Sequence, residues 1–425
     1  MPCGSRCTAE ANFGRGPMGI RRLLVGQSGG PTAAINASLA GVVETARALG
    51  IKTLGMRHGV EGLLEEDVVD LDLTLPTAAH LQLLRQTPAS YLGSCRFKLP
   101  DMTADPAPYR NLFSYFDING IDAVLYIGGN DSMDTISKLA AYGAAVGSSV
   151  RFIGVPKTID NDLEGIDHTP GFGSAAKFIA TSVAELARDA SVYDLDNVLV
   201  VEIMGRDAGW LAASSVLARQ DGLGAPHFIL TPEAPVDEAA LVDAVADKMG
   251  ETRTVVLAVS EGARRPDGSL MCEPPTGAIK VDAFGHAAAL SGTGRYLAGL
   301  IGSRLGLKTR AVELSTLQRC ASHLASATDL AEASALGGTA VRAAADGLTG
   351  KMPVIRRTGD RPYTVEYGLV DVADVANKER HIPRAWITPD GLDVTSEFVE
   401  YVRPLVAGEV APYCVDGLPH HIPAL

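Results

Sequence analysis

Cysteine, aromatic side chains and long apolar runs are all scarce in this sequence. Its six cysteines are scattered over 425 residues without a zinc-ligand spacing, which argues against a disulfide framework and a structural zinc site. No stretch approaches the roughly eighteen apolar residues of a membrane-spanning helix, so we expect no membrane partner. Unpaired thiols and the lack of a secretory signal predict a cytoplasmic protein.

Positive charge is also in short supply. The chain has 37 Lys and Arg residues against 50 Asp and Glu residues, which gives a net charge of −13. A chain this acidic lacks the basic surface of a general nucleic-acid binder, so we expect no nucleic-acid partner. A local cationic pocket in an acidic surface still allows an anionic substrate.

The remaining composition is that of an ordinary globular protein, 46% hydrophobic and 20% charged, and the length predicts two or three domains. Residues 1–19 contain no apolar segment. We expect them to form a disordered N-terminal tail, unless translation starts at Met18.

Short apolar runs alternate with segments of helical periodicity along most of the chain. This pattern predicts an α/β fold with a mostly parallel sheet covered by helices on both faces. In such sheets, ligands bind beyond the carboxyl ends of the strands. The five runs that we interpret as strands are Leu23–Gly26, Val124–Ile127, Phe152–Val155, Val198–Val201 and Val255–Val259.

Two of these predicted strands end in glycine-rich turns. The first turn is Ser28–Thr32, where glycine permits close backbone approach and the following helix offers free N–H groups to a phosphate. The second, Gly128–Ser132, adds Asp131, whose carboxylate suits a phosphate site only if a cation such as Mg²⁺ lies between them. Plain steric turns and helix caps are the alternative interpretations.

The segment Pro156–Asp162 is the most specific signal. It places Lys157, Asp160 and Asp162 at a strand end, and such crowding of charge is costly unless the charges balance one another. The lysine suits phosphate oxygens, one aspartate suits proton abstraction from a hydroxyl, and the other suits a metal. A solvated surface turn is the alternative.

Charged residues follow the last strands as well. Arg206 suits the charge of a transferring phosphoryl group, and Glu261 suits sugar hydroxyls. Arg310 and Arg319 lie nine residues apart and suit a second phosphate. Taken singly, each is more often a surface ion-pair residue.

Together these motifs resemble the phosphofructokinase family over about residues 20–351. The matching segments are Ser28–Gly30, Leu92–Arg96, Gly128–Ser132, Lys157–Asp162, Met204–Arg206, Ser260–Gly262, Arg310 and Arg319. The resemblance implies two similar Rossmann-like lobes with mostly parallel sheets and an active site in the cleft between them. We expect residues 20–171 plus 318–370 to form a phosphoryl-donor lobe, and residues 172–317 plus 371–425 a sugar-phosphate lobe.

Two positions make the sequence similar to the pyrophosphate-dependent branch of that family. ATP-using members carry glycine where Asp131 and Lys157 stand here. The carboxylate would repel and exclude the α-phosphate of ATP, and the ammonium would attract a donor without a nucleotide. The resemblance thus implies a magnesium-dependent phosphotransferase that moves a phosphoryl group reversibly from pyrophosphate to the 1-hydroxyl of fructose 6-phosphate.

The resemblance also implies a role for each matching residue. Asp160 would be the general base, with Thr158 and Asp162 organising the reacting centre and Asp131 and Asp162 binding Mg²⁺. The donor would contact the residues Gly30, Arg96, Asp131 and Lys157, with Arg206 stabilising the transferring group. The sugar phosphate would contact the residues Met204, Gly205, Glu261, Arg310 and Arg319.

Three departures from the family pattern bear on these roles. Asn130 replaces an aspartate at the metal site, and Asn197 and Thr316 replace an arginine and a histidine of the acceptor site. The last two leave a related acceptor such as sedoheptulose 7-phosphate open, and argue against the allosteric tetramer of ATP-using members. Because the family's counterpart of Arg310 reaches a neighbouring active site, we expect a homo-oligomer, at least a homodimer.

Three other functions remain as alternatives. An ATP-dependent phosphofructokinase shares every motif except the two donor positions. A non-catalytic regulatory subunit of the same fold would be expected to lose Asp160 or Arg206, and both are present. A dinucleotide-binding dehydrogenase ranks last, since Gly26–Pro31 is not a Gly-x-Gly-x-x-Gly turn.

Overall fold

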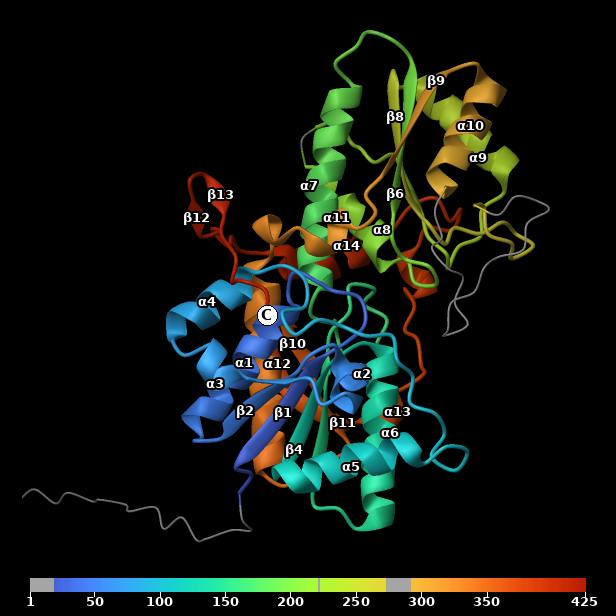
Figure 1. Ribbon diagram of the computed structural model, residues 1–425. Coiled ribbons are helices and arrows are strands. Elements are labelled where there is room, and N and C mark those ends of the chain that lie inside the picture. Colours follow the sequence, from blue (N-terminus) through green and yellow to red (C-terminus); the bar gives the residue numbers. More distant parts are fainter. Residues whose placement is uncertain (1–18, 221, 273–291) are drawn as a thin grey trace, which may run out of the picture.

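The computed structural model describes residues 19–220, 222–272 and 292–425 of the chain. The disordered tail that we predicted over residues 1–19 lies outside these ranges, apart from Gly19. Figure 1 shows two lobes, each built around its own sheet. Within the described ranges, no helix has the length and apolar character needed to cross a bilayer.

The first sheet has seven strands in the order β11-β10-β5-β4-β1-β2-β3. The five inner strands run parallel, and β11 and β3 lie antiparallel at the two edges. The strands are β1 (Arg22–Gln27), β2 (Lys52–Met56), β3 (Val68–Asp70), β4 (Ala123–Gly128), β5 (Arg151–Pro156), β10 (Lys351–Asp360) and β11 (Tyr363–Asp371).

The second sheet has four parallel strands in the order β7-β8-β6-β9. They are β6 (Asn197–Ile203), β7 (Phe228–Leu230), β8 (Thr254–Ser260) and β9 (Lys308–Glu313). The five strands predicted from apolar runs are β1, β4, β5, β6 and β8. The prediction of an α/β fold with mostly parallel sheets is therefore confirmed.

Helices cover both faces of each sheet, which explains why the central strands are apolar on both sides. On the first sheet, α1 (Ile35–Ala48) and α12 (Ala327–Ala345) pack on the face of Leu23 and Val25, and α5 (Ala107–Asn119) and α6 (Asn130–Val146) pack on the face of Leu24. On the second, α7 (Phe172–Ala190), α8 (Trp210–Ser214) and α14 (Ser396–Val402) lie opposite α9 (Glu238–Met249) and α10 (Thr293–Leu305).

Several shorter elements complete the chain. The remaining helices are α2 (Gly59–Leu64), α3 (Leu71–Thr74), α4 (Ala78–Gln86), α11 (Leu317–Cys320) and α13 (Val372–Val375), and a two-stranded ribbon is formed by β12 (Cys414–Val415) and β13 (Leu418–Pro419). Single 3₁₀ turns lie at Ser215–Ala218, Ser322–Leu324, Arg384–Trp386 and Arg403–Val406. In Figure 1 the β12–β13 ribbon projects from the side of the molecule.

The chain first leaves the lower lobe of Figure 1 at Gly171, whose φ of 107° favours glycine. A buried carboxylate fixes this crossing: Asp329 of α12 accepts hydrogen bonds from the N–H of Gly171 at 2.8 Å and of Ser174 at 2.9 Å. Both donors belong to the start of α7, where unpaired N–H groups and the helix dipole favour negative charge. The crossing into the second lobe is thus tied to the helix by which the chain returns.

The chain crosses to the second lobe again after β11, and its last residues return to the first lobe, where the N–H of Ile422 donates to Thr87 Oγ1 at 3.0 Å. Beyond Asp371 it runs back to the second lobe, where Phe398 and Tyr401 of α14 pack against Trp210 of α8. This path agrees in outline with the two-lobe arrangement inferred from the sequence. The residue boundaries given there for the two lobes stay a prediction.

Two glycines allow α1 and α12 to touch backbone to backbone. A Cβ on Gly41 would lie 2.0 Å from the carbonyl oxygen of Ser334, and one on Gly337 would lie 2.2 Å from that of Ser38. Gly41→Ala should therefore destabilise the protein by about 1–3 kcal/mol, because the helices must separate. Urea unfolding measures the change.

Gly299 supplies the matched control for this prediction. It is exposed on α10, and its added Cβ would meet nothing within 4 Å, so Gly299→Ala should stabilise by about 0.5–1 kcal/mol. Equal unfolding midpoints for the two variants would contradict the proposed contact.

Candidate active site

The carboxyl ends of β1, β4, β5 and β6 meet at one cavity of about 640 Å³ between the lobes. Eight of the residues predicted from the sequence line it: Gly30, Asp131, Lys157, Thr158, Asp160, Asp162, Met204 and Arg319. Arg96 and Arg206 line an adjoining pocket that shares Gly30 and Asp131 with the first. Segments far apart in the chain are thus gathered at one place, as expected for parallel strands.

The glycine turn after β1 lies between two cationic side chains. A Cβ on Gly29 would lie 3.5 Å from Lys157 Nζ, and one on Gly30 would lie 3.6 Å from Arg319 Nη1. The turn leads into α1, where Thr32 Oγ1 accepts a hydrogen bond from the N–H of Ile35 at 2.9 Å. A main-chain turn flanked by an ammonium and a guanidinium has the charge and shape that an anionic group requires.

Lys157 takes a more buried position than the sequence indicated. Lys157 is 1% exposed, and its Nζ donates hydrogen bonds to the carbonyl oxygens of Ser28 at 3.0 Å and Gly30 at 2.7 Å. Burial lowers the pKa of Lys157 to about 8. The side chain therefore holds the glycine turn through its carbonyl oxygens, and its charge also lies at the wall of the cavity.

The two aspartates after β5 have different surroundings. Asp160 Oδ2 accepts a hydrogen bond from Thr158 Oγ1 at 3.3 Å. Burial raises the pKa of the Asp160 carboxyl, while Thr158, Lys157, Arg206 and Arg319 oppose the rise. The pKa of Asp162 is also raised, first by burial and then by the Asp160 and Glu379 charges. A carboxylate of raised pKa beside cations is suited to accept a proton.

The second lobe contributes a strained turn after β6. Gly205 has a φ of 132°, and a Cβ there would lie 2.6 Å from the carbonyl oxygen of Ala208. Its N–H donates to Glu261 Oε1 at 3.4 Å, and its carbonyl accepts from Ser260 Oγ. Burial raises the pKa of Glu261 to about 7, and Asp160 adds to the rise. Met204 lines the cavity, whereas Gly205 and Glu261 are not among its lining residues, although the Glu261 carboxyl is near enough to interact with the Asp160 charge.

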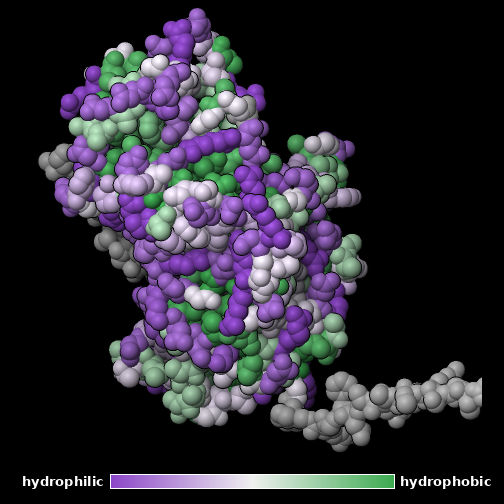
Figure 2. Space-filling model, turned by 180° about the vertical axis from the view of Figure 1, so that it is seen from behind, coloured by the Kyte–Doolittle hydropathy of each residue, from purple (hydrophilic) through white to green (hydrophobic). Residues whose placement is uncertain are grey.

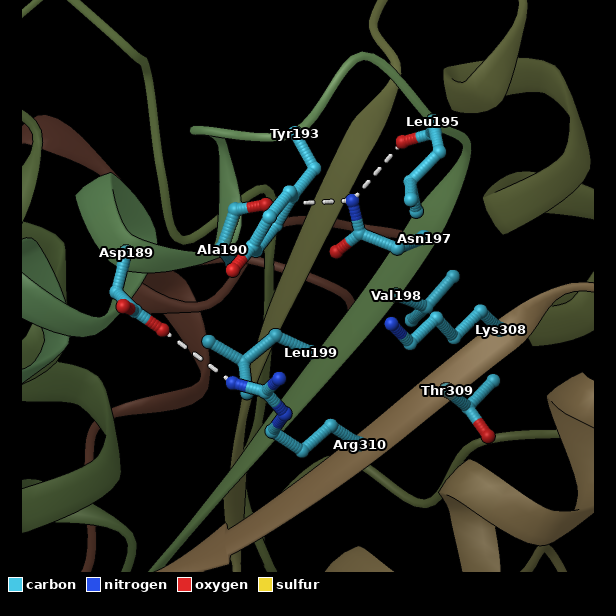
Figure 3. A pocket seen from close by; sticks show the side chains of 10 residues that line it. All are labelled: Asp189, Ala190, Tyr193, Leu195, Asn197, Val198, Leu199, Lys308, Thr309 and Arg310. Carbon is cyan, nitrogen blue, oxygen red and sulfur yellow. Dashed lines mark hydrogen bonds and ion pairs between the residues drawn. The ribbon is translucent and has the colours of Figure 1, made fainter.

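Arg310 is not brought into the cavity by this chain. It lies on β9 beside Asp189, Tyr193 and Asn197, and Figure 3 shows its guanidinium directed at the Asp189 carboxylate. The Arg310–Asp189 ion pair measures 3.3 Å, and 56% of the arginine side chain is exposed. The Arg310 guanidinium is therefore accessible on the surface of the second lobe.

A segment that sequence reasoning missed forms another wall of the cavity. Asn377, Glu379 and His381 line it, together with Lys98. The segment is attached to the first lobe, because Asn130 Nδ2 donates to the carbonyl oxygen of Lys378 at 2.9 Å. The only signal in the sequence is the unbroken polar run Asn377–His381 between apolar residues, which carries no known motif.

The residues at the end of β4 fit a magnesium ion. Asn130 Oδ1 is buried without a hydrogen-bond partner, and the residue lines the same cavity as the carboxylates of Asp131 and Asp162. Among the described residues, no three His, Cys, Asp or Glu side chains form a metal-binding group. Mg²⁺ needs no such group, because it keeps waters and binds through one or two carboxylates plus phosphate oxygens.

Comparisons with known proteins agree with this geometry. Residues 22–344 match the family described as Phosphofructokinase. A pyrophosphate–fructose 6-phosphate 1-phosphotransferase of Halomonas elongata is 41% identical over 92% of this chain and 93% of its own length. The Xanthomonas campestris pv. campestris protein of that name is 42% identical over 94% of this chain and 95% of its own length. The structure of a pyrophosphate-dependent phosphofructokinase from Nitrosospira multiformis superposes with a TM-score of 0.85 at 35% identity, covering 95% of this chain and 96% of that one.

The buried ammonium generates a pH-dependent prediction. Lys157→Met should weaken the binding of inorganic phosphate by a factor of about 10 to 150 at pH 7, since a charge-assisted contact is worth about 1.5–3 kcal/mol. The advantage of the wild type should disappear above pH of about 8, where Lys157 becomes neutral. Calorimetric titration with phosphate from pH 6 to 10 measures the affinity of both proteins. Because phosphate ionises alike in both titrations, its ionisation cancels in the ratio of the two affinities.

Lys177 provides the matched control for that titration. Its Nζ also donates to a main-chain carbonyl, that of Gly408 at 2.7 Å, but it lies outside the cavity. Lys177→Met should leave phosphate affinity unchanged at every pH. A similar loss in both variants would show that the effect comes from lost stability and not from the cavity.

Proposed function

The chain belongs to the phosphofructokinase family, and on that premise we propose that it transfers a phosphoryl group reversibly between pyrophosphate and the 1-hydroxyl of fructose 6-phosphate. The observation that carries the proposal is that Asp131 and Lys157 line one cavity with Asp160. The relatives of similar length whose names state this reaction support it. The products are fructose 1,6-bisphosphate and phosphate.

Donor choice follows from charge at the glycine turn. Asp131 stands in the first turn of α6 and borders both the main cavity and the pocket of Arg96 and Arg206. A nucleotide donor would bring its α-phosphate against this carboxylate, and the two negative charges repel. Pyrophosphate has no such group, and its two phosphates would lie between the Gly30 turn and the cations that surround it.

The acceptor would enter from the side of the second lobe. Met204, Gly205 and Glu261 would contact the sugar, and Arg319 its 6-phosphate. The Asp160 carboxylate would take the proton of the 1-hydroxyl as that oxygen forms its bond to the terminal phosphorus of pyrophosphate, while Thr158 holds the carboxylate in place. The bond to the bridging oxygen breaks, the leaving phosphate takes the electron pair, and Arg206 stabilises the charge on the group in transit.

Magnesium belongs to this proposal as the donor's counter-ion. Asp131, Asp162 and the unsatisfied Asn130 Oδ1 would hold it, so the asparagine retains an oxygen ligand where the family has an aspartate. When bound, the ion neutralises charge on the phosphate oxygens.

A second copy of the chain completes the proposal. Arg310 borders a pocket on β9 that shares no residue with the cavity, and its half-exposed guanidinium is directed at Asp189 (Figure 3), which suits a side chain that reaches the 6-phosphate bound by a partner. The active form would then be at least a homodimer. We place the enzyme in the cytoplasm, since Cys95, Cys320 and Cys414 form no disulfide.

A donor assay tests the proposed function directly. Purified protein with Mg²⁺ and fructose 6-phosphate should turn over with pyrophosphate and show no activity with ATP. Detection of fructose 1,6-bisphosphate by a coupled assay gives the rate, and the reverse reaction should form pyrophosphate from fructose 1,6-bisphosphate and phosphate. Turnover with ATP and none with pyrophosphate would overturn the proposal.

Removal of the base tests the proposed chemistry. Asp160→Ala should lower kcat by about 10²–10⁴-fold and change the KM for fructose 6-phosphate little, because the carboxylate acts on the proton transferred during the reaction. Steady-state kinetics measures both constants. Asp207→Ala, which removes a half-exposed carboxylate paired with Arg264, should behave as wild type. Near-normal turnover in Asp160→Ala would remove that residue from its role.

A further inference from the structure

Arg380 lies behind the aspartate turn, on the side away from the cavity. Its Nη2 and Nε donate hydrogen bonds to the carbonyl oxygen of Asn161 at 3.2 and 3.3 Å, and Nη1 donates to that of Ile166 at 2.9 Å and also to that of Asp167. Its main-chain N–H donates to the carbonyl of Asp162 at 2.7 Å. One residue therefore binds the main chain of the turn at four positions.

The other side of Arg380 belongs to the second lobe. Its guanidinium carbon lies 4.5 Å from the ring centroid of Trp210, and Trp210 Nε1 donates to its carbonyl oxygen at 3.0 Å. Trp210 is 2% exposed and begins α8, four residues after Arg206. Arg380 thus connects the turn that carries Asp160 to the segment that carries Arg206, although it belongs to neither sheet.

The turn needs such support because its backbone is unfavourable. Asn161 has a φ of 56°, in the left-handed region that costs a non-glycine residue about 1 kcal/mol or more. Tyr401 Oη assists: it accepts from Asn161 Nδ2 at 2.9 Å and from Arg380 Nη2 at 3.1 Å, and donates to the carbonyl of Asp167 at 2.8 Å. A planar guanidinium with five donors suits a set of converging oxygens in a way that an ammonium does not.

We propose that Arg380 is a positioning residue, which fixes the Asp160 carboxylate relative to Arg206 by clamping the Asn161 backbone to Trp210. The inference rests on the proposed function, because it assigns Asp160 and Arg206 to the reaction. It adds that the segment after β11, which forms no part of either sheet, sets the geometry between two groups that act in the same transfer step, one on the hydroxyl proton and one on the phosphoryl group.

Arg380→Ala should lower kcat about a hundredfold and leave both KM values within a few-fold of wild type. A misplacement of about 1 Å at the reacting groups costs a rate factor of this size, whereas ground-state binding depends on contacts that Arg380 does not make. Arg384→Ala is the matched control. Arg384 also donates to three carbonyls, those of Ile387, Thr388 and Pro389, but only within its own turn. It should leave kcat unchanged.

Chemical rescue separates positioning from a loss of stability. Millimolar guanidinium ion should restore part of kcat in Arg380→Ala, and equal sodium chloride should not, because the ion occupies the vacated space between Asn161 and Trp210. Arg380→Lys should recover less than guanidinium does, since one ammonium cannot reach all three carbonyls that the guanidinium of Arg380 binds. Thermal melting of each variant is recorded in parallel.

Tyr401→Phe decides the matter if Arg380→Ala fails to fold. It removes only the hydroxyl shared by Asn161 and Arg380 and keeps the ring against Trp210. It should lower kcat several-fold at unchanged KM. The inference is overturned if Arg380→Ala retains the kcat of Arg384→Ala, if KM rises in place of a fall in kcat, or if guanidinium gives no rescue while Tyr401→Phe is as active as wild type.

The design also separates this inference from the proposed function. All variants are compared with wild type using whichever donor supports turnover. Wild type that turns over ATP alone overturns the proposed donor, while the comparison of Arg380→Ala with Arg384→Ala proceeds. Wild type that is inactive with both donors overturns the proposed function and this inference with it.

Discussion

The cavity of the candidate active site depends on one buried ammonium group. Lys157 begins just beyond β5, and its Nζ crosses the end of β4 to the carbonyls of Ser28 and Gly30 beyond β1. An ammonium so deeply buried must be hydrogen-bonded, and its two acceptors belong to the turn that we assign to the donor. The same contact therefore shapes the turn, fixes its distance from Asp160 and supplies positive charge beside it. Lysine at this position does more than neutralise a ligand, because it joins two strand ends that β4 separates.

The second requirement is that the two lobes keep their relation to each other. Two polar contacts that cross the lobes serve this purpose, and neither involves the cavity itself. Asp329 binds the N-terminus of α7 where the chain first leaves the lower lobe, and Arg380 binds the aspartate turn to Trp210 where the chain crosses again after β11. Each contact includes the main chain of one residue with a positive φ, Gly171 for Asp329 and Asn161 for Arg380. Fixed lobes suit a reaction in which positioning and charge supply most of the acceleration.

Much of this arrangement could be predicted from the sequence, and the exceptions have physical causes. Apolar runs identified β1, β4, β5, β6 and β8, since a strand buried on both faces is apolar along its whole length. The depth of Lys157 could not be predicted, because it depends on the order of strands in the sheet. The nine-residue spacing of Arg310 and Arg319 predicted a shared phosphate site, which stays a prediction: β9 ends between them, so within one chain Arg319 lines the cavity and Arg310 lines another pocket. The segment Asn377–His381 gave only a polar run without a motif, because Arg380 acts on main-chain carbonyls of a turn more than two hundred residues earlier.

The strand order of the first sheet also has a consequence for synthesis on the ribosome. Strands β10 and β11 extend the sheet beyond β5, but the whole second sheet is encoded between β5 and β10. All four strands of the upper lobe's sheet are therefore translated while β5 still lacks its neighbour and presents an unpaired edge. The strands that carry the two glycine turns can therefore pair early in translation. Arg380 is translated after β11, so its contact with Asn161 can form only when translation is almost finished.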